Sequence, residues 1–152
     1  MSYDVVVLTV QPELIAAVRS TVRLGEVGRA WKPALDQVWD LLHANPGIVR
    51  GHNLFLYHHP ARREDPMSVD FGVQVAERFE PAGPVHCVET PAGEVARTVH
   101  VGPYDQLRGA HDAIHAWCAA HGRTIRAASW ELYGDHNDDP ALLETTITYL
   151  LG

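Results

Sequence analysis

The chain has 152 residues, which is enough to bury the core of one domain and too few for two ordinary domains. Its formal charge of −7, with a single lysine, argues against a nucleic-acid partner, because phosphate binding needs clustered Lys and Arg. The N-terminus carries neither a basic segment nor a long apolar run, so we expect no signal peptide, no membrane span and a cytoplasmic protein.

Hydrophobic periodicity in the first half predicts the order strand, strand, helix, strand, strand. Alternating apolar residues predict the strands, and apolar residues at helical spacing after Gly25 predict the helix, which ends at Asn45-Pro46-Gly47. A polar loop with two prolines separates the last two strands. The expected elements are strands at 3–10 and 15–24, a helix at 27–44, and strands at 53–58 and 69–77.

The second half predicts the same order after a linker at 80–84, where two prolines and a glycine favour neither helix nor strand. Pro91-Ala92-Gly93 is expected to form a hairpin turn between the first two strands. Short connections join antiparallel neighbours, so each half should be an antiparallel sheet with one helix on its face, an α+β fold. The expected elements are strands at 85–90 and 94–101, a helix at 104–121, and strands at 128–133 and 143–150.

Two similar segments indicate an internal duplication. Thr21-Val22-Arg23-Leu24-Gly25 resembles Thr98-Val99-His100-Val101-Gly102, and a similar strand follows each copy. The interval from Gly25 to Tyr57 is 32 positions and that from Gly102 to Tyr133 is 31, so the register agrees to one residue. We predict a single domain, 1–152, built from two pseudo-symmetric β-β-α-β-β modules: repeat 1 at about 3–79 and repeat 2 at about 85–151.

Strand alternation places the most informative acid of the chain. Side chains alternate between the two faces of a strand, so Ser129, Glu131 and Tyr133 should share one face. Trp130 and Leu132 should then point to the other face and lie under the helix. Glu131 interrupts an otherwise apolar pattern, which makes it the leading candidate for a functional residue.

The corresponding strand of the first repeat has an aromatic residue where the second has the acid. By the repeat, Phe55 and Tyr57 should lie on the face equivalent to that of Glu131, with Leu54 and Leu56 beneath their own helix. Tyr57 then corresponds to Tyr133. The two repeats would therefore offer aromatic and polar groups to one shared surface.

The element His100-Val101-Gly102-Pro103-Tyr104, followed by a helix with Trp117 and by Trp130-Glu131-Leu132-Tyr133, resembles the GyrI-like small-molecule-binding family. This family includes the effector-binding domains of multidrug-sensing bacterial transcription activators. The resemblance implies a ligand cleft between the two modules with a glutamate at its base, and Glu131 matches that position. The regulators carry an additional helix-turn-helix segment, whereas residue 5 already lies in the first strand here. We therefore expect a stand-alone form without direct DNA binding.

Aromatic rings around a buried carboxylate suit planar hydrophobic, often cationic compounds. Each cation–π contact contributes about 0.5 to 2 kcal/mol, and burying an unpaired carboxylate is costly unless the ligand brings a positive charge. Few directional hydrogen bonds predict broad specificity, as in a multidrug-binding protein for xenobiotic resistance. The alternative is that Glu131 is an ordinary surface residue of a strand, paired with an arginine.

Four further side chains are candidates for the ligand site: Trp39, Met67, Phe71 and Tyr104. Each has an alternative interpretation. Trp39 could pack at an edge or in a dimer contact, Met67 and Phe71 could be core residues rather than a flexible wall, and Tyr104 could be a hydrophobic staple. Trp31 is closer to the apolar stripe of its helix and is expected in the core.

An enzyme is the second hypothesis. The resemblance includes hydrolases that open cyclopropane-containing electrophilic natural products, for which Glu131 could be general acid or base, with Tyr133 or Tyr57 as donor. A third hypothesis, a protein-binding regulator, follows from gyrase-inhibiting members of the family, and a homodimer is compatible with the sequence. The chain has no readable Ser-His-Asp or Cys-His arrangement for acyl transfer.

Metal and cofactor sites are not expected. His111 and His115 have the i, i+4 spacing of zinc proteases, but no third ligand follows, so a solvated helix flank explains them better. The pair His58-His59 is interpreted as loop polarity. Cys87 and Cys118 lack metal-type spacing and are expected to be reduced thiols.

Overall fold

The computed structural model describes residues 2–23 and 25–152. The strand predicted at 15–24 includes Leu24, which lies outside the described residues. Both halves show the predicted order of strands and helix, and the α+β class is confirmed. The elements are β1 Val6–Val10, β2 Leu14–Val22, α1 Val27–Ala44, β3 Val49–His58, β4 Met67–Val75, β5 Val85–Glu89, β6 Gly93–Val101, α2 Arg108–Ala120, β7 Ile125–Tyr133 and β8 Glu144–Leu151, with short 3-10 helices at Pro46–Ile48, Tyr104–Gln106 and Pro140–Leu142.

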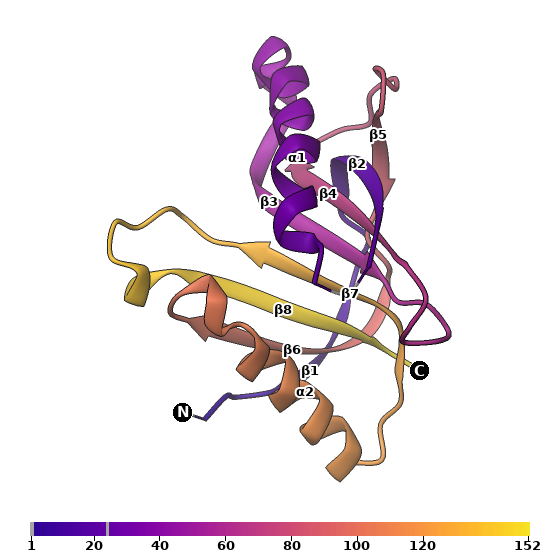
Figure 1. Cartoon of the computed structure of the whole chain (residues 1–152), viewed down its shortest axis with the longest axis vertical. Coiled ribbons are helices and arrows are strands. Elements are labelled where there is room, and N and C mark those ends of the chain that lie inside the picture. The colour runs from indigo at the N-terminus through magenta and orange to yellow at the C-terminus, as the bar shows by residue number, and fades with distance from the viewer. Residues whose placement is uncertain (1, 24) are drawn as a thin grey trace. The chain divides into compact units, whose positions relative to one another are not determined.

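The chain forms two compact units, each with four antiparallel strands and one helix (Figure 1). Unit 1 comprises Met1–Gln11 and Pro91–Gly152, and its strands follow the order β1-β6-β8-β7. Unit 2 comprises Pro12–Thr90, with the order β3-β4-β2-β5. Within the described residues, no helix combines the length and the apolar composition needed to cross a membrane.

The first strand of each repeat pairs with a strand of the other repeat. β1 pairs with β6, and β5 pairs with β2. The expectation that each sheet uses its own four consecutive strands, with a hairpin turn at Pro91-Ala92-Gly93, is therefore wrong. A short connection allows a hairpin but does not require one, and here it leads from one unit to the other. The backbone amide of Glu13 donates to Thr90 Oγ1 and that of Thr90 donates to the Glu13 carbonyl, both at 2.8 Å, so the exchanged connections are bonded to each other.

The core of unit 1 lies between α2 and the strands β6 and β8. Three residues spaced by four positions, Ala110, Ile114 and Cys118, form the buried stripe of α2. They meet alternate residues of β8, namely Ile147, Tyr149 and Leu151, all 5% exposed or less. Burial raises the pKa of the Cys118 thiol, in agreement with a reduced core cysteine.

The same register places Glu131 on the helix side of the sheet. Glu131 is paired with Ile147 and Ser129 with Tyr149, and directly paired residues of antiparallel strands share a face. Trp130 and Leu132 consequently point away from α2, and the prediction that they lie under the helix is wrong. Alternation alone could not decide this, because it groups side chains without indicating which group the helix covers.

Unit 2 repeats this arrangement. The buried residues of α1 include Leu35, Val38 and Leu42, and the helix covers the face that carries Phe55. Phe55 packs edge-on against Phe71 with ring centroids 4.8 Å apart. Leu54 and Leu56, expected beneath the helix, lie on the opposite face of β3, so that prediction is wrong for the same reason as in unit 1. Trp31, expected in the core, is 38% exposed at the edge of this packing.

A glycine in β4 provides the first test of this packing. A Cβ atom at Gly72 would lie 2.8 Å from the carbonyl oxygen of Ala16 and 3.1 Å from the Ala17 Cβ. Gly72→Ala should therefore lower the free energy of unfolding by about 1 to 3 kcal/mol in urea denaturation. Gly28→Ala is the matched control: nothing lies within 4 Å of its Cβ, and a helical alanine should add up to about 1 kcal/mol. Equal stability of the two variants would contradict the close approach of β2 and β4.

Candidate functional site

Glu131 is buried on the helix side of unit 1, where an ionised carboxylate needs hydrogen bonds. The residue is 6% exposed. Its Oε1 accepts from the Tyr133 hydroxyl at 2.7 Å, and its Oε2 lies 2.7 Å from His111 Nε2. The alternative that Glu131 is a surface residue of the strand is therefore wrong. Glu131 is thus a buried carboxylate whose position is fixed by contacts with Tyr133 and His111.

His111 of α2 is the partner that the sequence prediction missed. Its Nε2 faces Glu131, and its Nδ1 lies 2.8 Å from the hydroxyl of Tyr149. The interpretation of His111 as part of a solvated helix flank is thus wrong. A signal did exist: His111 lies three residues before Ile114 and four after Leu107, at the edge of the buried stripe. Among the described residues, no group of three or more His, Cys, Asp or Glu side chains could hold a metal ion.

Tyr149 extends this hydrogen-bonded chain into the core of unit 1. Burial and the nearby negative charge of Glu131 raise the pKa of the Tyr149 phenol to about 12. The phenol therefore stays protonated at neutral pH and can donate to His111. Because desolvation disfavours a second anion beside Glu131, the Tyr149 phenol adds no negative charge to this region.

Two tyrosine rings lie beside the acid. The Tyr104 ring packs edge-on against that of Tyr133, with centroids 5.4 Å apart, and Tyr104 is 44% exposed. Its loop is held by His100, whose ring bonds to the Pro103 carbonyl and to the Tyr3 hydroxyl. We call this group the Glu131 site; it comprises Tyr104, His111, Glu131, Tyr133 and Tyr149.

The remaining candidates lie in unit 2, on the side of its sheet that α1 covers. Phe71 is 0% exposed, which favours its core interpretation over a flexible wall. Phe55 and Tyr57 are buried on β3, and Met67 is half-buried at the start of β4. Trp39 donates from Nε1 to the side chain of Asn53 at 3.0 Å, which fixes its ring over β3.

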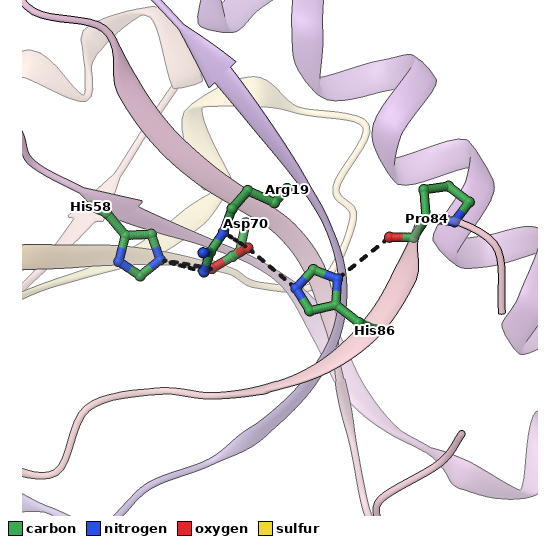
Figure 2. A network of polar contacts seen from close by, with 5 residues as sticks. All are labelled: Arg19, His58, Asp70, Pro84 and His86. Carbon is green, nitrogen blue, oxygen red and sulfur yellow. Dashed lines mark hydrogen bonds and ion pairs between the residues drawn. The ribbon is translucent and has the colours of Figure 1, made fainter. Parts of the chain in front are cut away.

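A second carboxylate, Asp70, is the centre of a polar cluster in unit 2 (Figure 2). Asp70 is 0% exposed, and both of its oxygens accept from Arg19, at 2.9 Å each. His58 Nε2 lies 2.7 Å from Asp70 Oδ2, and His86 Nε2 lies 3.8 Å from Oδ1. We call these four residues, which come from four neighbouring strands, the Asp70 cluster. The interpretation of His58 as loop polarity is therefore wrong.

The groups bonded to Asp70 include a permanent cation. Burial alone would raise the pKa of Asp70, but hydrogen bonds from His58 and Arg19 and the charge of Arg19 hold it below its usual value. The guanidinium neutralises Asp70 at every physiological pH. In unit 1, Glu131 accepts a bond from a phenol and lies against an imidazole. Asp70 is thus held in a permanent ion pair, which leaves Glu131 as the carboxylate to consider for a ligand site.

The family profile of GyrI-like small molecule binding domains matches residues 3–149, almost the whole described chain. The chain belongs to this family. The resemblance carried by the His100 to Tyr104 element and by Glu131 is thereby confirmed at the level of the family. A comparison with curated proteins finds no match for this GyrI-like chain.

Solved structures show the same GyrI-like fold. The C-terminal domain of EcmrR is 24% identical, with a TM-score of 0.82 over 100% of this chain and 99% of that one. A hydrolase encoded by lin2189 from Listeria innocua is 11% identical, with a TM-score of 0.69 over 97% and 91%. SAV2435, bound to tetraphenylphosphonium, is 11% identical, with a TM-score of 0.66 over 100% and 94%. At these identities the likeness establishes the fold alone.

Proposed function

We propose that this GyrI-like protein binds planar or bulky hydrophobic cations at the Glu131 site and sequesters them, as a multidrug-binding protein would. The observation that carries the proposal is a buried carboxylate beside two tyrosine rings, one of which, Tyr104, is 44% exposed. Aromatic faces attract cations, and a buried negative charge acts strongly because little water screens it. Within unit 2, Phe55, Tyr57, Met67 and Trp39 are further candidates for ligand binding.

The hydrogen bonds of Glu131 narrow the ligand class. Both carboxylate oxygens already accept a bond, one from Tyr133 and one from His111. The site therefore offers charge and ring faces more readily than directional acceptors. This arrangement suits permanent cations without N–H donors, such as quaternary ammonium or phosphonium compounds. The tetraphenylphosphonium bound to SAV2435, which shares the fold, supports this choice of probe.

The test removes only the charge. Glu131→Gln should weaken binding of tetraphenylphosphonium about tenfold, because a charge-assisted contact contributes about 1 to 2 kcal/mol more than its neutral counterpart. Binding of the uncharged triphenylphosphine oxide should change less than about twofold. Isothermal titration calorimetry measures both affinities directly.

Glu144→Gln is the matched control, since Glu144 is an exposed acid on β8 of the same unit. It should leave both affinities unchanged, because water and salt screen an exposed charge. An equal loss of affinity for the cation and the neutral probe in Glu131→Gln would show that the carboxylate supports the structure of the site without attracting charge.

A hydrolase remains the second candidate, and one observation favours it. His111 bonded to Glu131 at 2.7 Å forms a pair that can take up and return a proton, with the Tyr133 hydroxyl as a donor beside it. Such a pair could activate water for attack on a strained ring. Incubation of the protein with an electrophilic cyclopropane and mass spectrometry of the product would test this: a gain of one water that is lost in Glu131→Gln supports catalysis, and unchanged substrate supports binding alone.

A further inference from the structure

His111 lies between a carboxylate, which can only accept a hydrogen bond, and a phenol, which can donate or accept one. Its Nε2 is 2.7 Å from a Glu131 oxygen, and its Nδ1 is 2.8 Å from the Tyr149 hydroxyl. A carboxylate only accepts, so Nε2 must carry a proton. The phenol can donate to Nδ1 or accept from it, so the neutral and the protonated imidazole both satisfy the two bonds.

The two protonation states of His111 differ in charge while keeping these bonds. With neutral His111, the pair of His111 and Glu131 has a charge of −1; with protonated His111, its charge is zero. We propose that His111 determines the ligand class of the Glu131 site: the neutral imidazole leaves the site selective for cations, and the protonated imidazole makes it selective for neutral ligands of similar shape. This inference rests on the proposed binding function.

Other charged groups near His111 are weaker candidates for this role. On α2, the side chains of Arg108 and Asp112 are 87% and 70% exposed and lie 3.8 Å apart, so water screens their charges. His115, one turn after His111, contacts the Tyr149 ring at 5.0 Å but has no bond to Glu131 among the contacts that the structure shows. The ionisable groups facing His111 from the sheet are Glu131 and Tyr133 of β7 and Tyr149 of β8, with His100 on the same side of β6.

The burial of the pair makes the effect measurable. The side chains of His111 and Glu131 are only 22% and 7% exposed, so a proton on His111 lies close to the carboxylate with little water between them. Cancelling a partly buried charge at this distance should change the affinity for a cation by about tenfold or more. The same change should leave a neutral ligand nearly unaffected or improve its binding.

The experiment compares tetraphenylphosphonium, whose charge does not depend on pH, with triphenylphosphine oxide. Affinities are measured by calorimetry from about pH 5.5 to about pH 8.5. For the natural protein, the cation should bind about tenfold more weakly at the acidic end than at the alkaline end. In His111→Gln, which retains an N–H donor toward Glu131 but cannot take up a proton, this dependence should shrink to less than about threefold.

His115→Gln is the control for a general effect of removing a helical histidine, and it should keep the full pH dependence. Thermal unfolding of each variant at both ends of the range verifies that it is folded. The same pH dependence in His111→Gln as in the natural protein would overturn the inference. Absence of saturable binding of the cation at every pH would instead overturn the proposed function, so the two failures are distinguishable.

Discussion

Replacing Asp70 by asparagine should lower the free energy of unfolding by about 2 to 3 kcal/mol at neutral pH, because charge-assisted hydrogen bonds to a fully buried carboxylate are lost. Arg19 is half-exposed, so water can hydrate its guanidinium once the carboxylate is gone. The loss of unfolding free energy should therefore be smaller than for a fully buried ion pair. Asp36→Asn is the matched control. Asp36 pairs with Lys32 on the surface of α1, and its loss should cost less than about 0.5 kcal/mol.

The pH dependence of this effect has a definite sign. The pKa of Asp70 in the folded protein lies below the usual 3.8, because hydrogen bonds from His58 and Arg19 outweigh the effect of burial. Its contribution to stability is therefore complete above that usual value and disappears as the pH falls through the lowered one. Urea unfolding at several pH values should show the natural protein and Asp70→Asn converging under acid. A constant difference down to the lowest pH would contradict the role of the ionised carboxylate.

Phe71→Ala should have the largest effect on stability, a loss of about 3 to 5 kcal/mol. Phe71 is 0% exposed, packs edge-on against Phe55 and is paired with Val18 across the sheet of unit 2. Truncation leaves a cavity that these neighbours cannot fill. Phe79→Ala is the control, since Phe79 is half-buried beyond the end of β4, and its loss should cost less than about 1.5 kcal/mol in the same urea titration.

The milder variant Phe71→Leu separates packing from binding. It should fold and bind tetraphenylphosphonium with the affinity of the natural protein, because a side chain that is 0% exposed touches no ligand. A clear loss of affinity in a folded Phe71→Leu variant would restore Phe71 as part of a ligand wall. The measurement thus decides between the two interpretations that the sequence left open.

Periodicity predicted most of the secondary structure, because each element buries a stripe or a face with a regular spacing. The helix predicted at 27–44 is observed as Val27–Ala44. The second helix was predicted from residue 104, whereas Tyr104–Gln106 form a 3-10 turn and α2 begins at Arg108. Hydrophobic periodicity does not reveal where the 3-10 helix ends and the α-helix begins, because the apolar side chain of Leu107 fits both kinds of helix.

The pairing of strands was harder to predict from the sequence, because it depends on contacts between residues that are far apart in the chain. The hairpin predicted at Pro91-Ala92-Gly93 was the simplest solution for a short connection, yet β5 and β6 belong to different units. The side of each sheet that its helix covers was also predicted incorrectly. Leu54 and Trp130 are as apolar as residues under a helix, so composition could not distinguish two faces that are both buried.

The candidate site shows what sequence reasoning can and cannot find. Glu131 was identifiable because an acid in an apolar strand needs an explanation, and Tyr133 follows from alternation. His111 was not, since its bond to Glu131 joins a helix to a strand 20 positions away in the sequence. Asp70 escaped notice because its partner Arg19 is 51 positions away and neither residue belongs to a motif.

The exchange of first strands has a consequence for how the protein is made. Unit 2 is one continuous segment, Pro12–Thr90, whereas unit 1 is interrupted by it. Val10 is paired with Gly93, 83 positions later, so β1 leaves the ribosome long before its partner strand exists. Unit 2 can close as soon as β5 emerges, while the unit that contains Glu131 waits for β8. Vectorial synthesis therefore favours completion of unit 2 before unit 1 and its Glu131 site.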